Sequence, residues 1–497
     1  MDNDGMNASN DGMSTLVDGM DTSNSDTSVN GLTRKYGLIT ATALVVGCVI
    51  GAGVFFRPGR VLYNTNGDIL MSVLAWVVGG ITMMCGSYVF AKLATKYEKT
   101  GGFVDYGEAV IGPKYGYSIG WYLTHICSPC FTVILAIIAA DFTGQFLKLD
   151  PEMFGWDSQF VFTLAGIYII VIYAINCLSP KIAGKIGTTT TFIKMIPIVV
   201  IAIGGMIWSM FHDVPSVGEM IQNRVGDSTG GSFFGALVAT GLAYDGWYTV
   251  ASLNTEIKNS KRNLPIALIA GAIIVILAYV LYSLGLSFLG DRSSLPSSSG
   301  DESIWARNAF SNFVNGGFAT IVILFIIISC LGSLNGNVMG QNRSLYALSV
   351  RGRGPNPKMF SQIDPITNTP NNASIYTLLL TFFWFGIQLI SELWGWGVYK
   401  WDDTGLIFDV GDMAVVAFYI VVIPLLVGFM IKEKDYNFFD RFVMPSLATA
   451  MLIFGIVSFF VQGTLNDTPG WLVATAYIVV ILGIIGVGFV WYKPKEV

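Results

Sequence analysis

Long apolar runs alternate with short polar segments along the chain from residue 36 onward. A helix of about 20 apolar residues crosses the ~30 Å hydrocarbon layer of a membrane. Because a helix satisfies its own backbone hydrogen bonds, it is the expected form of each run. The pattern therefore predicts an all-α polytopic membrane protein with twelve transmembrane helices. The predicted spans are residues 36–62, 69–94, 117–147, 160–178, 189–211, 232–254, 265–290, 317–342, 373–393, 406–430, 443–463 and 470–492.

The composition supports this class. The 497 residues are 53% hydrophobic and only 12% charged, with a mean hydropathy of +0.60. A soluble domain is about a quarter charged, so a string of soluble domains is excluded. The lipid bilayer is the expected surrounding, and the net charge of −5 gives no reason to predict a nucleic-acid partner.

The chain offers little for catalysis or metal binding. It has two histidines and no CxxC or HExxH pattern, so neither a metal nor another cofactor is predicted. All six cysteines fall inside apolar runs, where small buried side chains are more probable than disulfides. No nucleophile–base pair and no phosphate-binding loop is evident. We therefore predict that the protein is not an enzyme.

Residues 1–31 differ from the rest because they are polar and contain no Lys or Arg. The tripeptide DGM recurs there with a period of seven, but the repeat is polar and forms no coiled-coil seam. We predict a disordered, acidic cytoplasmic tail. Translation from Met6, Met13 or Met20 is an alternative.

The basic residues predict the orientation. If the N-terminus is cytoplasmic, most of the 28 Lys and Arg residues fall on inner loops and inner span ends. Inner loops of membrane proteins are enriched in Lys and Arg. We therefore expect a multi-pass protein of the cell membrane with both termini in the cytoplasm.

The first span contains the stretch GCVIGAGVFFRPG, residues 47–59. Gly47 and Gly51 form a GxxxG pair, which by itself is typical of close helix packing. Glycine also weakens a helix, and Gly51 and Gly53 lie in the middle of the span. We therefore expect the first helix to be broken here.

A second interruption, ATGLAYDGW, lies in the sixth span and contains Gly241, Asp245 and Gly246. Breaks in the first and sixth spans predict two five-helix halves that form an inverted repeat, with the binding site at their interface. The halves are residues 36–211 and 232–430, and residues 443–492 add two more helices.

Each break exposes backbone groups that a dry membrane interior cannot leave unpaired. A zwitterion satisfies them, since its carboxylate suits the positive N-terminus of a half-helix. Its ammonium suits the freed carbonyl oxygens. Glycine allows the ligand to approach the backbone closely.

Four motifs in order resemble those of the amino acid–polyamine–organocation superfamily, and most closely its L-amino acid transporter branch. GCVIGAGVFFRPG resembles the first helix, and LAYDGW with EIKNSKRNLP resembles the sixth helix and its loop. SCLGSLNG with Arg343 resembles the eighth helix, and TGGFVDYGEAVIG resembles the loop before the third. The resemblance runs from about residue 36 to 492.

The resemblance implies a core of ten helices plus two, in which the substrate carboxylate meets the N–H groups of Ala52 and Gly53. Carbonyl oxygens of Val49, Leu242 and Asp245 would receive the amine. The implied substrate-binding residues are Val49, Ile50, Gly51, Ala52, Gly53, Gly241, Leu242, Tyr244 and Asp245.

There are departures from the family pattern. Ala52 stands where serine is common, and Leu242 where many relatives place an aromatic gate. The loop at 148–158 lacks the cysteine by which animal relatives bond a heavy chain. We therefore expect no covalent heavy-chain partner.

Lys194 lies inside the fifth span, where an ammonium costs roughly 2.5–3.5 kcal/mol. It could snorkel toward the interface. The resemblance implies instead a lysine that replaces sodium and bridges the first helix to Ser329 or Ser333 of the eighth. That role predicts sodium independence and leaves proton coupling open.

Three acidic residues also have predicted roles. The Asp245 side chain could bind a substrate cation or cap the outgoing half-helix, and we favour the cap. Asp409 and Asp412 begin the tenth span and could face an outer vestibule.

Taken together, these features predict a secondary active amino acid transporter, a permease or exchanger, that works by alternating access. We expect neutral L-amino acids as substrates. The alternative is a non-transporting amino acid sensor on the same fold.

Overall fold

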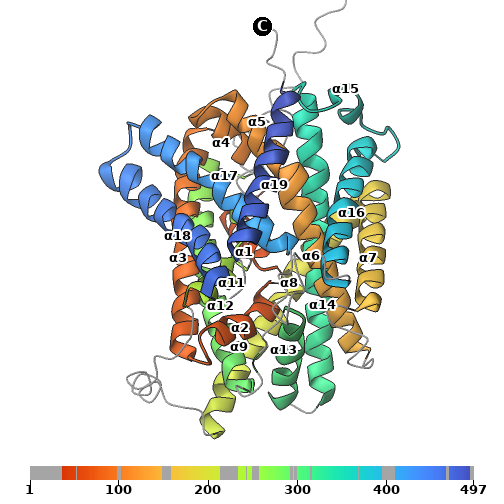
Figure 1. Cartoon of the computed structure of the whole chain (residues 1–497), viewed down its shortest axis with the longest axis vertical. Coiled ribbons are helices and arrows are strands. Elements are labelled where there is room, and N and C mark those ends of the chain that lie inside the picture. The colour runs from red at the N-terminus through yellow and green to blue at the C-terminus, as the bar shows by residue number, and fades with distance from the viewer. Residues whose placement is uncertain are drawn as a thin grey trace, which may run out of the picture.

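The structure, a computed structural model, describes residues 36–51, 53–97, 102–147, 158–212, 233–241, 243–248, 257–291, 295, 299–313, 316–367, 369–393, 409–465 and 470–492. Regular structure in these residues is helical, apart from one parallel bridge between Tyr36 and Ile257 (Figure 1). The helices of the first half are α1 (Leu38–Val49), α2 (Gly53–Asn64), α3 (Ile69–Lys96), α4 (Phe103–Val110), α5 (Pro113–Tyr122), the π-helix η1 (Leu123–Cys127), α6 (Ser128–Phe146), α7 (Gln159–Leu178), α8 (Pro180–Ile193) and α9 (Met195–Phe211). Those of the second half are α11 (Phe233–Gly241), α12 (Ser260–Leu289), α13 (Ser299–Phe313), α14 (Gly316–Val350), α15 (Pro357–Phe360), α16 (Asn371–Leu393) and α17 (Val410–Lys432). The π-helix η6 (Phe439–Val443), α18 (Met444–Leu465) and α19 (Gly470–Val490) complete the chain.

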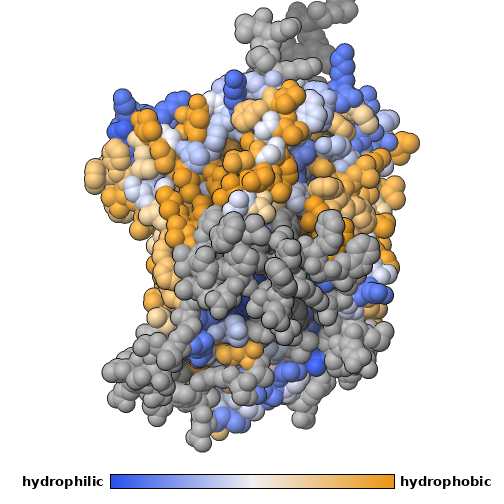
Figure 2. Space-filling model, in the orientation of Figure 1, coloured by the Kyte–Doolittle hydropathy of each residue, from blue (hydrophilic) through white to orange (hydrophobic). Residues whose placement is uncertain are grey.

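The polytopic helical class is confirmed. Within the described residues, nine helices are long and apolar enough to cross a membrane, and α1 with α2 forms a bent pair that adds a tenth. The lipid-facing surface agrees with this class, since exposed apolar side chains gather on the flanks, over α18 on one side and α16 on the other (Figure 2). The α16 residues Ile375, Leu379 and Phe383 are examples.

Two elements differ from the prediction. The fifth span was expected at residues 189–211, but its helix already begins at Pro180, because Pro is well suited to the first helical turn. No span is predicted for the polar segment before the eighth span, yet this segment forms the helix α13. Its low hydrophobicity hid it from a search for apolar runs.

The core helices form two groups (Figure 1). In the first, α3 and α12 pack along each other, and α1, α2 and α11 contact one or both of them. In the second, α6 packs against α14, α7 and α16. The two breaks lie in the first group, facing the second.

The helix α9 crosses α12 at unusually short range. A Cβ atom on Gly205 would lie 2.2 Å from the carbonyl oxygen of Gly285, and one on Gly285 would lie 2.3 Å from that of Ile201. Small residues allow two membrane helices to approach in this way. The crossing fixes the fifth span to the first group of helices.

Ion pairs gather on the face that carries the C-terminus. Lys96 of α3 binds Glu433 at 2.6 Å and Asp435 at 2.7 Å, beyond the end of α17. Arg351, just after α14, binds Asp105 of α4 at 2.9 Å. These pairs connect chain segments that follow different spans.

Candidate functional site

The first span is broken where the glycines predicted it. Helix α1 ends at Val49, Ile50 is extended, and α2 restarts at Gly53 with a bend of 52°. The first turn of α2 has backbone N–H groups without a partner in their own helix. Those of Gly53 and Val54 have no hydrogen-bond partner among the described residues. This end of α2 is suited to an anion.

The second break touches the first. Helix α11 ends at Gly241, and residues 243–248 form turns. Gly246 has φ +94°, and a Cβ atom there would lie 2.7 Å from the Cys48 carbonyl oxygen of α1. A Cβ atom on Gly53 would lie 2.9 Å from Cα of Ala243. The two breaks therefore meet backbone to backbone, and glycine is required at both contacts.

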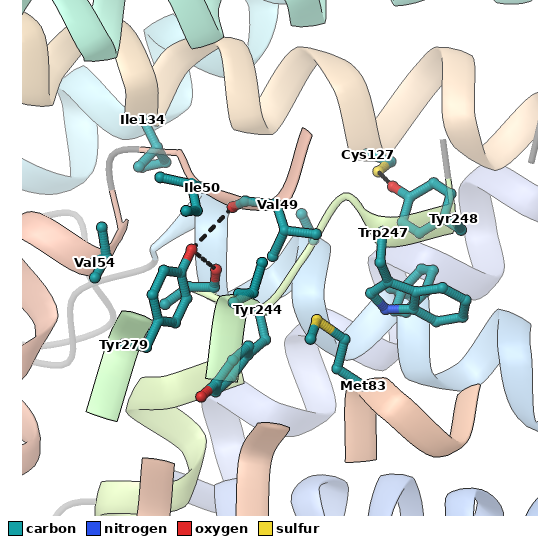
Figure 3. Packing of buried hydrophobic residues seen from close by; sticks show 14 of the residues in the cluster. Val49, Ile50, Val54, Met83, Cys127, Ile134, Tyr244, Trp247, Tyr248 and Tyr279 are labelled. Atoms are coloured by element: carbon teal, nitrogen blue, oxygen red, sulfur yellow. Dashed lines mark hydrogen bonds between the residues drawn. The ribbon is translucent and has the colours of Figure 1, made fainter. Parts of the chain in front are cut away.

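Tyr279 of α12 joins the two breaks. Its hydroxyl lies 3.0 Å from the Val49 carbonyl oxygen and 2.9 Å from that of Ala243 (Figure 3). Sequence analysis missed this residue. The sequence does place this tyrosine in the middle of an apolar run. A buried tyrosine hydroxyl usually has a hydrogen-bond partner, so its position could have indicated a contact.

Lys194 lies at the junction of α8 and α9 and is only 4% exposed. Its ammonium donates to the carbonyl oxygens of Gly47 at 2.5 Å and Ile50 at 2.6 Å. The snorkelling alternative is therefore wrong, because the charge is buried against the end of α1.

Ser329 and Ser333 of α14 face the same region but are not bonded to this ammonium. Their hydroxyl oxygens are buried and have no hydrogen-bond partner within the described part of the chain. A Cβ atom on Gly51 would lie 3.9 Å from the Ser333 hydroxyl and 3.8 Å from the Val49 carbonyl oxygen. A methyl group at Gly51 would thus make only ordinary van der Waals contacts toward α14. The role of both serines stays a prediction.

Three predicted residues of the second break face away from the first. The Tyr244 hydroxyl donates to the Trp76 carbonyl oxygen of α3, and Figure 3 shows its ring directed away from Val49. Gly241 and Asp245 line, with Tyr244, a cavity of about 50 Å³ whose other walls are α3, α17 and α18. The Asp245 carboxylate also accepts a hydrogen bond from the N–H of Gly246.

The third span contributes a π-helix beside the second break. Cys127 in η1 lies with its sulfur 3.2 Å from the Tyr248 hydroxyl (Figure 3). His125, two residues earlier in η1, contacts the Tyr376 hydroxyl at 3.0 Å, and its carbonyl oxygen accepts a hydrogen bond from the Trp384 indole N–H at 2.7 Å. His125 therefore joins η1 to α16. Such π-bulges are common at functional sites, because they free carbonyl groups for other partners.

Some predicted positions lie outside the described residues. These are Ala52, Leu242 and most of the 148–158 loop. Among the described residues, no group of three or more His, Cys, Asp or Glu side chains could hold a metal ion.

Comparison with known proteins gives a consistent picture. The family model "Amino acid permease" matches residues 36–485. The serine/threonine exchanger SteT of Bacillus subtilis (strain 168) is 31% identical over 366 residues, covering 74% of this chain and 79% of SteT. The cystine/glutamate transporter of Homo sapiens is 27% identical over 353 residues, covering 70% and 67%. The b(0,+)-type amino acid transporter 1 of Mus musculus is 24% identical over 477 residues, covering 95% and 91%.

Proposed function

The chain belongs to the amino acid permease family and is an amino acid transporter, not an enzyme; we propose that it binds its substrate where the two broken helices meet. In this proposal it is a secondary active permease or exchanger that works by alternating access. It has twelve spans in a five-plus-five inverted repeat and lies in the cell membrane with both termini in the cytoplasm.

The observation that carries the proposal is the start of α2, where the N–H groups of Gly53 and Val54 lack a partner among the described residues and lie against the second break. The substrate carboxylate binds the N–H groups at the start of α2, including Gly53, where the helix dipole is favourable. The ammonium shares carbonyl oxygens of the breaks, such as Val49. A carbonyl oxygen has two lone pairs, so Val49 can accept from Tyr279 and from the ligand together.

Sodium independence is supported by Lys194. Its ammonium places a positive charge against the end of α1 and binds two of the carbonyl oxygens that a cation would need. An ammonium held against these oxygens repels a second cation, which disfavours a sodium ion there.

Neutral L-amino acids are the proposed substrates, because the side-chain atom nearest to a Cβ on Gly51 is the uncharged hydroxyl of Ser333. A second candidate is an amino acid with a cationic side chain. It is favoured by Asp245, whose carboxylate lines a cavity together with the aromatic side chains of Trp247, Phe418 and Tyr419. Aromatic faces attract cations.

No covalent heavy chain is part of the proposal. The test is uptake by the purified chain alone in proteoliposomes. Activity that appears only after a single-span glycoprotein is added would contradict this part of the proposal.

The site itself is tested with Gly51→Ala. A Cβ atom fits there without a clash, so the variant should fold, yet the methyl group occupies the space through which the carboxylate approaches. We expect uptake to fall roughly tenfold or more, as for loss of one charge-assisted hydrogen bond. The matched control is Gly386→Ala in α16, where a Cβ atom meets nothing within 4 Å. If a folded Gly51→Ala variant took up substrate at the parental rate, the proposed position of the binding site would be wrong.

A further inference from the structure

Arg57 in α2 is a charged residue that is only 5% exposed. One terminal nitrogen of its guanidinium lies 3.5 Å from a carboxylate oxygen of Glu302 in α13. The other lies 3.5 Å from a carboxylate oxygen of Asp412 in α17. A single side chain thus connects three helices that are distant in sequence.

The charges of this cluster do not balance. Asp409, the N-cap of α17, adds a third carboxylate that acts on Arg57, and Arg60 is a second cation that acts on Glu302, so two arginines face three acids. Asp409 has its own donors, the N–H groups of Gly411 and Asp412. Glu302 is 0% exposed, and neither of its oxygens has a hydrogen-bond partner among the described residues. Of the two arginines, Arg57 is the one paired with the Glu302 carboxylate and has the larger effect on it.

Removing the charge of Arg57 should therefore affect the closed arrangement differently from removing the charge of Glu302. Loss of Arg57 removes the main counter-charge of two buried carboxylates, Glu302 and Asp409, which is strongly unfavourable. Loss of the Glu302 charge leaves Arg57 still paired with Asp412 and near Asp409. The closed arrangement thus requires the guanidinium but tolerates a neutral residue 302.

The cluster lies on one side of the break, and an opening lies on the other. Helices α2 and α13 are on the face opposite the C-terminus (Figure 1). Cys48, in the last turn of α1, is the one exposed residue of the six cysteines, all of which are described. It nevertheless lies close enough to Lys194 and Tyr248 to act on them electrostatically. Cys48 on the α1 side of the break is therefore accessible, whereas Arg57 on the α2 side is buried.

We propose that Arg57 is the positioning residue of the outer gate, and that its guanidinium keeps α2, α13 and α17 together while the site is open toward the α1 side. The inference rests on the proposed alternating access. When the outer face opens, Arg57 separates from Glu302 and Asp412 and water solvates all three. A buried ion pair is suited to this role, because its attraction and its desolvation cost nearly cancel.

Cys48 supplies a readout that does not depend on transport. When α1 closes against the second group of helices, the Cys48 thiol becomes covered and its alkylation slows. The measurement is the rate of Cys48 modification by N-ethylmaleimide in the purified full chain, followed by peptide mass spectrometry. Cys48→Ser identifies the signal.

Arg57→Met should shift the population toward the outward-open state and slow Cys48 alkylation roughly tenfold. Arg57→Lys keeps the charge, but one ammonium cannot serve two carboxylates as a guanidinium does, so an intermediate rate is expected. Glu302→Gln should be alkylated at least as fast as the parent. The control is Arg307→Gln, on the same helix as Glu302, where the arginine contacts its neighbour Asn308 and the rate should not change.

Misfolding cannot explain slower Cys48 alkylation in Arg57→Met together with unchanged or faster alkylation in Glu302→Gln. Parental rates in both Arg57 variants, or equal slowing in Arg57→Met and Glu302→Gln, would overturn the assignment. Uptake assays on the same preparations separate the two proposals. A parent that transports, with alkylation rates unchanged in the variants, refutes the gate alone, whereas a parent that does not transport refutes the proposed function.

Discussion

Single side chains occupy the carbonyl oxygens that the first break frees. Lys194 donates to Gly47 and Ile50, and Tyr279 donates to Val49. Without these partners the oxygens would be buried and unpaired, at a cost of about 1–3 kcal/mol each. The break is therefore stable before any ligand binds. A substrate then adds contacts at the start of α2 and shares carbonyl oxygens such as that of Val49.

The Lys194 variants separate three mechanisms. Lys194→Ala should lose most uptake, because two carbonyl oxygens lose their partner. Lys194→Arg should rescue poorly, since a planar guanidinium does not fit a site formed for a compact ammonium. If the lysine couples protons instead, Lys194→Ala should lose pH-driven accumulation but keep exchange at equal concentrations.

The measurement is uptake and counterflow of the parent and both variants, in sodium and in choline, at two pH values. The parent should be equally active in both salts. A strict sodium requirement in the parent, or parental rates in Lys194→Ala, would remove Lys194 from the mechanism.

Asp245→Asn tests the substrate class. The Asp245 carboxylate accepts a hydrogen bond from the Gly246 N–H. If capping is its only role, the asparagine side chain can replace it, and uptake of neutral amino acids should stay within about twofold of the parental rate. If it binds a substrate cation, uptake of lysine or arginine should fall at least tenfold while neutral uptake persists. Competition of labelled neutral and basic amino acids in one assay decides between these outcomes.

The sequence predicted the positions of both breaks, because glycine in mid-span has a direct backbone consequence. It could not predict Tyr279 or the direction of Tyr244. Both depend on which helix lies opposite, and apolar runs of similar hydrophobicity do not specify their neighbours. The sequence likewise could not show whether Lys194 is buried, because a lysine a few residues into a span can also extend to the interface.

Helix crossings at glycine fix the elements in place. Gly285 of α12 and Gly205 of α9 let two backbones approach so closely that neither position has room for a Cβ atom. No propensity rule marked these glycines among the many in the chain. By contrast, α13 was missed because a polar helix outside the membrane lacks the apolar run that reveals a span.

Gly285→Val should force α9 away from α12. Overpacking of this kind costs about 1–3 kcal/mol, and a lower melting temperature in detergent is expected. The control is Gly483→Val in α19, which is exposed and where a Cβ atom meets nothing within 4 Å. Equal melting temperatures for the two variants would show that the crossing does not limit stability.

The whole molecule has ion pairs on both faces. Lys96 with Glu433 and Asp435 lies on the face of the C-terminus, and Arg57 with Glu302 lies on the opposite face. The hydrogen bond from Lys96 holds the pKa of the exposed Asp435 carboxyl below its usual range. Burial instead raises the pKa of Glu302 to about 7, despite the opposing effect of Arg57.

The Glu302 shift predicts how pH acts on the outer gate. When the face is open and Glu302 is in water, its pKa returns to about 4.3. The closed state therefore binds the proton more tightly, and its extra stability is lost as the pH rises through about 7. The charged groups that bear most on this carboxyl are Arg57, Arg60, Asp412 and Asp409.

The check is the Cys48 alkylation rate of the parent divided by that of Glu302→Gln, a ratio in which the ionisation of the thiol cancels. The ratio should be near one at about pH 6 and fall by about pH 8. A ratio that does not change with pH would show that Glu302 does not titrate in the gate.

Counterflow in proteoliposomes tests the central claim most directly, that the meeting point of the two breaks is a transport site with alternating access. Vesicles with the purified chain are loaded with unlabelled neutral amino acid, and entry of the labelled compound is followed in choline medium. We predict transient accumulation above equilibrium with the parent and with Gly386→Ala, and none with Gly51→Ala. Accumulation that survives in a folded Gly51→Ala variant, or that is absent with the parent for every amino acid tried, would contradict the account.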